Sequence, residues 1–106
     1  MSSNDAGWVD VAPAADLTDG GILSVEVEGL ALLLARCGER LHAVEDRCTH
    51  DGEPLGSGEV ESCEIICPRH FARFSLRTGE ALTPPAYEPL RTYPVREQNG
   101  RILVQV

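Results

Sequence analysis

Hydrophobic and polar residues alternate along several short stretches of the chain, as they do in half-buried β-strands. Leu23, Val25 and Val27 are separated by polar residues, whereas residues 30–36 form a more continuously apolar stretch, which favours a deeply buried strand. Further strands are expected at residues 8–11, 40–45, 92–97 and 101–106. The pattern therefore predicts an all-β chain built from short strands.

Turn-forming residues separate these stretches. Glu28-Gly29 and Cys37-Gly38-Glu39 are typical of tight turns, and Asn99-Gly100 is a strong hairpin signal. Only Asp16–Gly20 suggests a turn of helix, and no segment has a sustained helical period. Short strands with frequent turns predict a small antiparallel β-sandwich or barrel.

Length and charge narrow the possible functions. The 106 residues suggest one domain, and the net charge of −8 disfavours nucleic acid or an anionic membrane as a partner. An acidic surface fits either docking to a basic patch on another protein or plain solubility. No stretch is apolar enough to span a bilayer, and the first residues do not resemble a secretory signal. We therefore expect a cytoplasmic protein, and nothing in the sequence demands more than a monomer.

Residues 46–86 break the strand pattern and gather side chains that bind metals. Two clusters stand out, Cys48-Thr49-His50 and Cys67-Pro68-Arg69-His70, with sixteen residues between His50 and Cys67. We expect Arg40–Glu45 to lead into the first cluster and Glu64–Ile66 into the second. Each cluster offers one thiolate and one imidazole on a short loop, and loops held by a β-scaffold commonly carry function.

Two mixed pairs of this kind suit a binuclear iron–sulfur centre. Each iron of a [2Fe–2S] cluster needs two protein ligands, so one iron can take both cysteines and the other both histidines. Each loop then contributes to both irons, and neither loop holds the cluster alone. A structural zinc site is the alternative, although zinc sites usually pair Cys with Cys and His with His.

These residues resemble those of the Rieske iron–sulfur proteins, and more closely the Rieske-type ferredoxins of bacterial ring-hydroxylating oxygenases. The resemblance covers nearly the whole chain. It rests on the two clusters together with flanking positions: Leu55, Gly58, Ala72-Arg73-Phe74, Thr78-Gly79, Ala81-Leu82 and Thr83-Pro84-Pro85-Ala86. It implies a single Rieske domain over residues 1–106, with a cluster-binding subdomain at about residues 46–86. It also implies one [2Fe–2S] cluster held by Cys48, His50, Cys67 and His70.

The chain departs from relatives at several positions beside the cluster. Phe71 replaces the usual glycine after the second histidine. Glu53 and Arg69 stand where respiratory and photosynthetic Rieske proteins carry a disulfide. Ala72 and Phe74 stand where those proteins place serine and tyrosine hydroxyls near a sulfur. Without those hydrogen bonds we predict a low reduction potential, about −150 mV, at the bottom of the Rieske range.

The resemblance implies a soluble one-electron carrier, not an enzyme. Its partners would be a flavin-dependent ferredoxin reductase and a terminal non-heme iron oxygenase, both bound transiently. Relatives also occur beside iron–sulfur assembly systems, which leaves that role open. An oxygenase catalytic chain needs a further two-His-one-carboxylate site, and only His42 remains beyond the ligands. The cluster-free Rieske-fold subunits of some nitrite reductases lack the ligands that are present here.

The remaining chemically distinctive residues have simpler interpretations. Cys63 is expected to be a small buried or half-buried strand residue, and Cys37 a free thiol at a turn. A disulfide between them is disfavoured in the cytosol. His42 is interpreted as structural or surface, and Trp8 as part of the core. Arg69 and Arg73 would meet an acidic partner or remain solvated beside the cluster; both interpretations stay open.

Overall fold

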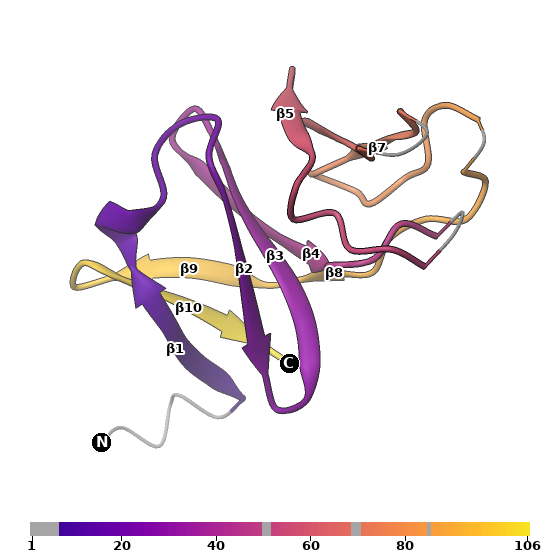
Figure 1. Ribbon diagram of the computed structural model, residues 1–106. Coiled ribbons are helices and arrows are strands. Elements are labelled where there is room, and N and C mark those ends of the chain that lie inside the picture. Colours follow the sequence, from indigo (N-terminus) through magenta and orange to yellow (C-terminus); the bar gives the residue numbers. More distant parts are fainter. Residues whose placement is uncertain (1–6, 50–51, 69–70, 85) are drawn as a thin grey trace.

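The computed structural model describes residues 7–49, 52–68, 71–84 and 86–106 (Figure 1). These residues form short strands and one turn of 3-10 helix, so the all-β prediction is confirmed. The elements are β1 (Trp8–Pro13), η2 (Ala14–Asp16), β2 (Ile22–Val27), β3 (Leu30–Cys37), β4 (Arg40–Glu45), β5 (Glu59–Glu61), β6 (Glu64–Ile66), β7 (Arg73–Ser75), β8 (Thr92–Tyr93), β9 (Val95–Gln98) and β10 (Arg101–Gln105).

The strands form three antiparallel sheets, in the orders β1-β10-β9, β2-β3-β4-β8 and β5-β6-β7. Hairpin turns set much of the register. Val27 pairs with Leu30 across Glu28 and Gly29, whose φ angles of 52° and 83° suit a tight two-residue connection. Asn99 and Gly100 likewise have positive φ angles between β9 and β10. Both turns therefore lie where the sequence predicts them.

Two expectations for local structure were wrong. The single strand expected over residues 92–97 is divided by Pro94 into β8 and β9, which belong to different sheets. Proline has no N–H with which to continue a ladder, which explains the break. The helical turn lies at Ala14–Asp16, which shares only Asp16 with the Asp16–Gly20 segment where it was expected.

Strand β3 lies at the centre of the hydrophobic core because its side chains alternate between two buried clusters. Leu33 and Ala35 pack with β4 and with residues of the 46–86 segment, including Leu55, Ile65 and Phe74. Leu32 and Leu34 face the other way and pack with η2, β2, β4 and β10. All four β3 residues are fully buried. This explains why residues 30–36 are so continuously apolar.

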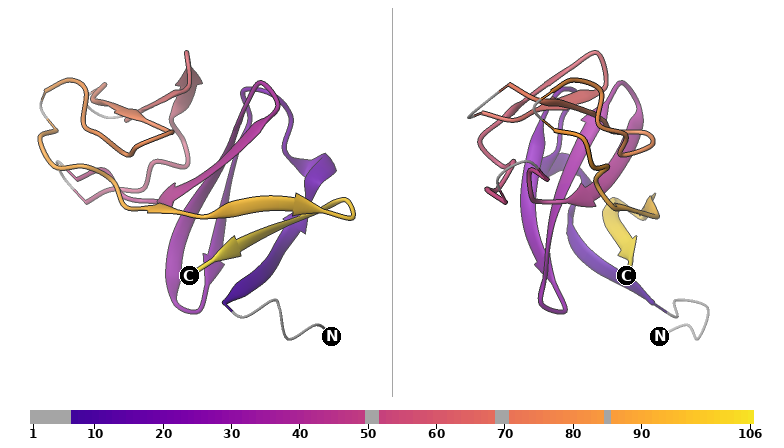
Figure 2. Two further views of the ribbon diagram at one scale, coloured as in Figure 1. Left: turned by 180° about the vertical axis from the view of Figure 1, so that it is seen from behind. Right: turned by 90° about the vertical axis from the view of Figure 1, so that its right-hand side faces the viewer.

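The β5-β6-β7 sheet and the loops around it project from one end of the molecule (Figures 1 and 2). Figure 2 shows, from behind, that the loop after β4 and the loop before β8 reach the same end as this sheet. The molecule is correspondingly elongated, with extents of 44 × 25 × 19 Å. Within the described residues, no helix has the length and apolar character needed to cross a membrane.

Candidate metal centre

The first candidate ligand, Cys48, lies three residues after the end of β4, in a closed loop. The Cys48 amide donates to the carbonyl of Glu53 at 2.7 Å, and the Gly52 amide donates to the carbonyl of Cys48 at 2.7 Å. Asp46 closes the base of the loop, because its Oδ1 accepts from the Leu55 amide at 2.7 Å. The chain therefore turns back on itself around the position of the first Cys-X-His motif.

The second candidate ligand, Cys67, follows directly after β6 in a loop of the same design. The Cys67 amide donates to the carbonyl of Ala72 at 2.8 Å, and the Phe71 amide donates to the carbonyl of Cys67 at 3.0 Å. The expectation that Arg40–Glu45 and Glu64–Ile66 lead into the two loops is thus confirmed.

The two loops share one backbone pattern. In each, the cysteine amide bonds to the carbonyl five residues later, and the cysteine carbonyl accepts from the amide four residues later. That fourth residue has a positive φ angle in both loops, 79° at Gly52 and 60° at Phe71. The left-handed conformation suits glycine and strains a bulky residue. Phe71 thus occupies a position whose counterpart in the first loop is a glycine.

Neither Cys48 nor Cys67 is part of a disulfide, neither side chain has exposed surface, and both belong to the same buried cluster of side chains. Two buried cysteines that avoid a disulfide, each presented by its own closed loop, fit the thiolate half of a mixed thiolate–imidazole ligand set. The predicted imidazole ligands, His50 and His70, lie outside the described residues. By sequence, each falls between the two residues whose backbone hydrogen bonds close its loop.

A third segment runs against the two loops. Thr49 Oγ1 donates to the carbonyl of Glu88 at 2.6 Å, which ties the first loop to the segment before β8. The Arg73 amide donates to Thr83 Oγ1 at 2.9 Å, which ties the second loop's exit to the proline-containing segment. The Thr83–Ala86 segment, singled out in the sequence, therefore starts beside the second loop; Pro85 lies outside the described residues.

The expectations of a free thiol at Cys37 and of a strand position for Cys63 were wrong, although Cys63 is half-buried as expected. The two residues form a disulfide with a Cα–Cα distance of 5.5 Å, so Cys37 is not a free thiol. Cys63 is not a strand residue either, because it lies in the turn between β5 and β6 with a φ angle of 60°. The sequence offered little sign of this pairing, because the cysteines lie 26 residues apart in different hairpins.

Other singled-out residues have structural partners. Arg73 bonds to Glu61 at 2.7 Å and to Glu64 at 3.1 Å, which holds β7 against the β5–β6 hairpin. Trp8 is half-buried, not fully in the core, and the Arg96 guanidinium lies 4.3 Å from its ring centroid. Arg69 lies outside the described residues.

His42 is half-buried on β4, and its Nε2 atom is buried with no hydrogen-bond partner among the described residues. Burial lowers the pKa of His42 from its usual value, and the charges of Arg77 and Arg40 lower it further. The imidazole is therefore kept neutral, in agreement with the structural interpretation of this residue.

Comparison with known proteins shows to which family the chain belongs. Residues 7–94 match the Rieske [2Fe–2S] domain. The chain is 34% identical to the ferredoxin component of a naphthalene 1,2-dioxygenase system from Pseudomonas putida, over 93% of this chain and 95% of that protein. It is 41% identical to the 3-phenylpropionate/cinnamic acid dioxygenase ferredoxin subunit of Photorhabdus laumondii subsp. laumondii, over 91% of both chains.

Similarity to solved structures agrees with the family match. A chain from the complex of reduced oxygenase and oxidized ferredoxin in carbazole 1,9a-dioxygenase superposes with a TM-score of 0.88 at 32% identity, covering 93% of both chains. The named relatives are components of oxygenase systems, which does not favour a role in cluster assembly. The chain therefore belongs to the Rieske [2Fe–2S] family, as a ferredoxin that carries electrons on one such cluster and is not itself a catalytic subunit.

Proposed function

We propose that this ferredoxin passes single electrons from a flavin-dependent reductase to a terminal non-heme iron oxygenase in the cytoplasm, as a monomer. Its ligands are Cys48 and Cys67 on one iron and His50 and His70 on the other, presented by the segment of about residues 46–86. When bound, the cluster supplies a site that accepts and releases one electron.

The observation that carries this proposal is the pair of matched loops. Each loop completely buries one cysteine that is not part of a disulfide, and each closes with the same two backbone hydrogen bonds. Zinc sites usually pair Cys with Cys and His with His, whereas a cluster with two cysteines on one iron and two histidines on the other can take one Cys and one His from each of two separate loops. The repeated loop design therefore favours the binuclear centre.

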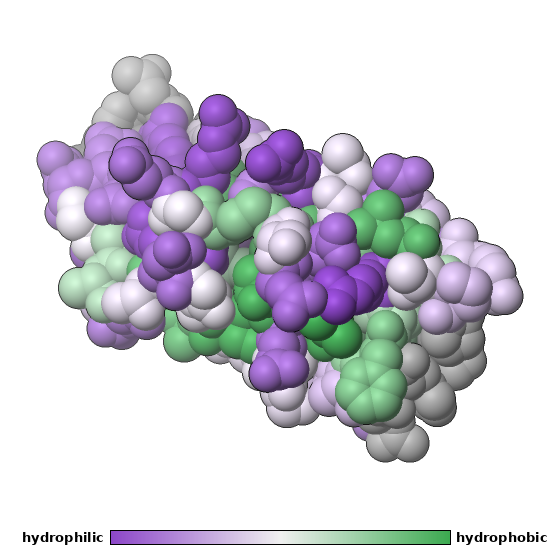
Figure 3. Space-filling model, turned by 90° about the horizontal axis from the view of Figure 1, so that it is seen from above, coloured by the Kyte–Doolittle hydropathy of each residue, from purple (hydrophilic) through white to green (hydrophobic). Residues whose placement is uncertain are grey.

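The same end of the molecule offers a surface for partners. Phe71 and Tyr87 are 71% and 81% exposed, and Leu82 is 41% exposed. Figure 3 shows hydrophobic atoms at the surface of this end, among polar side chains. Exposed aromatic side chains next to a redox centre suit a small transient interface, and the net charge of −8 favours partners with a basic docking face.

Spectroscopy of purified variants tests the ligand set. Replacing His50 or His70 by alanine is expected to abolish the visible absorption and the EPR signal of the reduced cluster, whereas replacing His42 by glutamine should leave both intact. His42 is the matched control because it is the chain's third histidine and lies outside the two loops. A colourless, zinc-loaded wild type, or a His50 variant with an unchanged spectrum, would overturn the assignment.

Rapid mixing tests the carrier role. The reduced holoprotein is mixed without oxygen with the terminal oxygenase of a related dioxygenase system, and the reoxidation of the ferredoxin is followed in the visible. Fast reoxidation that slows as salt is added would support electrostatically assisted docking. No transfer to any such oxygenase, combined with normal transfer to a cluster-assembly protein, would favour the alternative role.

A further inference from the structure

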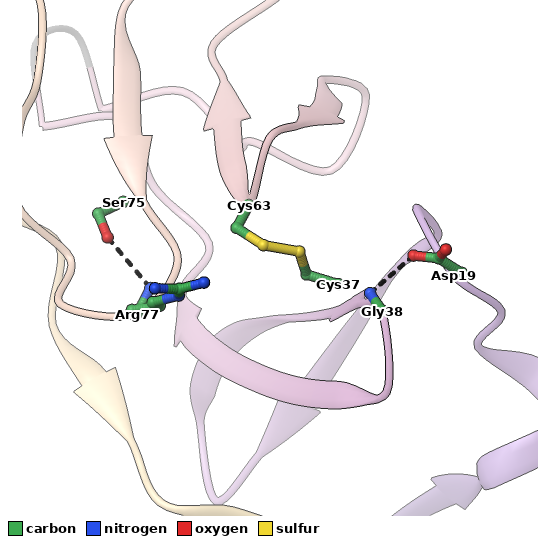
Figure 4. The surroundings of a disulfide bond; sticks show 6 residues. All are labelled: Asp19, Cys37, Gly38, Cys63, Ser75 and Arg77. Atoms are coloured by element: carbon green, nitrogen blue, oxygen red, sulfur yellow. Dashed lines mark hydrogen bonds between the residues drawn. A yellow bond between two sulfur atoms is a disulfide. The ribbon is translucent and has the colours of Figure 1, made fainter.

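The Cys37–Cys63 disulfide joins the tips of two hairpins that belong to different sheets. Cys37 is the last residue of β3, just before the Gly38-Glu39 turn, and Cys63 lies in the turn between β5 and β6 (Figure 4). The Gly38 amide donates to Asp19 Oδ1 at 2.8 Å, which anchors the first tip. The Cys63 carbonyl accepts from the Leu76 amide at 3.0 Å, which anchors the second.

Cys63 occupies a backbone position that does not favour cysteine. Ser62 and Cys63 have φ angles of 54° and 60°, the left-handed pair that a two-residue hairpin requires. Glycine, asparagine and aspartate are the usual residues in such turns, because other side chains are strained there. Local turn preference therefore does not account for a cysteine at this point, whereas its bond to Cys37 does.

The disulfide connects parts of the fold that strand pairing leaves separate. Among the described residues, β5, β6 and β7 pair with one another, and Phe74 forms an isolated bridge with Ala81, but none of them pairs with a strand of the other two sheets. Hydrophobic packing, including the cluster that Leu33 shares with Ile65 and Phe74, provides a further connection, and the Leu90 amide donates to the carbonyl of Gly79 at 2.7 Å. The covalent ring from residue 37 to residue 63 encloses the first ligand loop and ends four residues before Cys67.

The bond is also open to attack by a thiol. Cys37 and Cys63 are only partly buried, and Cys63 lines an open groove of about 420 Å³ together with Arg77, Ser75 and Thr78. A thiolate that enters this groove can attack one sulfur, and the nearby guanidinium of Arg77 favours the thiolate form of the departing sulfur. A second thiol of the same dithiol then completes the exchange, leaving Cys37 and Cys63 as two thiols and the dithiol oxidised to a disulfide.

We propose that the Cys37–Cys63 disulfide is a redox-controlled cross-link between the β5-β6-β7 sheet and the β3–β4 hairpin, and that opening it by a dithiol reductant makes the cluster easier to lose. Closed, the bond limits how far the two ligand loops move relative to the rest of the fold. Open, the small sheet loses its covalent cross-link to that hairpin and is held by packing and by loop hydrogen bonds, so local opening exposes the metal centre more often.

The first test establishes the bond. Holoprotein purified in air is denatured without reductant and treated with an alkylating agent. Two labelled cysteines, Cys48 and Cys67, are expected, together with a Cys37–Cys63 peptide pair in the digest. Four labelled cysteines would overturn the proposal at once.

The second test measures cluster loss. Holoprotein is incubated with an iron chelator, with or without dithiothreitol, and the decay of the visible absorption is followed. Dithiothreitol is expected to speed the decay by roughly tenfold in the wild type, because the loop constraint is removed. It should have no effect on the matched Cys37→Ser/Cys63→Ser control, which should decay at the fast rate in both conditions. Equal wild-type rates, or slow decay of the control, would overturn the proposal.

A third measurement tests the proposal without the Cys37→Ser/Cys63→Ser variant, in case that variant does not fold. Wild-type holoprotein is reduced by dithiothreitol without chelator and alkylated at Cys37 and Cys63. Its rate of cluster loss to the chelator and its midpoint of thermal unfolding are then compared with those of the unreduced holoprotein. Faster loss and a lower midpoint are expected, and unchanged values would overturn the proposal. Because no partner protein is used, a failure here is distinguishable from a failure of the proposed electron transfer.

Discussion

Phe71 combines a strained backbone with a side chain that gains little from burial. Its φ angle is 60°, and 71% of its surface is exposed. A non-glycine residue in the left-handed conformation is destabilised by about 1–2 kcal/mol. The strain is retained without compensating burial, so the exposed ring is better explained by contact with a partner than by stability.

Replacing Phe71 by glycine is therefore expected to stabilise the fold. The gain should be about 0.5–1 kcal/mol, because the relief of strain is partly offset by the greater flexibility of unfolded glycine. Denaturant unfolding measures it. Phe71→Ala, which removes the ring but keeps the strain, serves as the control and should show no gain. A glycine variant less stable than the wild type would show that the ring, despite its exposure, stabilises the loop.

His42 makes stability depend on pH. Because its pKa is lowered in the folded protein by burial and by Arg77 and Arg40, the unfolded chain binds a proton more readily than the native chain as pH falls below about 6.5. Glu39, Arg96 and Glu97 line the same groove as His42 and Arg40, so the local charge is mixed. The wild type should lose stability relative to His42→Gln as pH falls from 7 to 5, measured by urea unfolding in a pH series. A constant difference between the two proteins would contradict this.

Ala72 and Phe74 are fully buried hydrocarbon side chains that follow the second ligand loop. Introducing a hydroxyl here, as Ala72→Ser, is expected to raise the reduction potential above about −150 mV, because hydrogen bonds near the sulfurs stabilise the reduced cluster. Ala43→Ser is the control, since Ala43 is equally buried but lies in the other hydrophobic cluster. If a redox titration gives the same shift in reduction potential for both variants, a hydroxyl beside the sulfurs is not the cause of the shift.

At the scale of elements, close backbone approach fixes the entry to the second ligand loop. Gly58 precedes β5, and a Cβ atom built there would lie 2.2 Å from the carbonyl oxygen of Ile66, the residue before Cys67. Gly58→Ala must therefore push β5 away from β6, at a cost of about 2–3 kcal/mol. Gly20→Ala is the control, because a Cβ atom at residue 20 would have no atom within 4 Å. Only the backbone strain of its φ angle of 80° remains, at a cost of about 1 kcal/mol. Equal losses in thermal or denaturant unfolding would contradict the steric argument.

The strands show what local pattern does and does not determine. Alternation and turn residues predicted the hairpin β2–β3 and the β9–β10 turn, because each is settled by neighbouring residues. The strand expected over residues 92–97 is divided because Pro94 has no backbone N–H to donate to a ladder. The alternation of apolar and polar residues does not take this into account. In the candidate site, residue type and spacing were sufficient to single out Cys48 and Cys67. The shared backbone pattern of their loops depends on hydrogen bonds that no spacing reveals.

At the scale of the whole molecule, the Cys37–Cys63 pair could not be predicted, because it depends on how two distant hairpins meet. Losing it has a thermodynamic cost. A loop closed over a sequence separation of 26 residues stabilises a fold by about 3.5 kcal/mol through the unfolded chain. Cys37→Ser/Cys63→Ser should lose about that much free energy of unfolding relative to the oxidised wild type. The difference should vanish when both are measured in reductant; a persistent difference would point to packing of the sulfurs instead.

The covalent ring has one more consequence. A single peptide-bond cut anywhere from residue 38 to residue 62 opens the ring but releases no fragment, because the two pieces of the chain stay joined through the Cys37–Cys63 bond. A ferredoxin nicked by a protease beside its first ligand loop would migrate as two bands on a gel only after reduction.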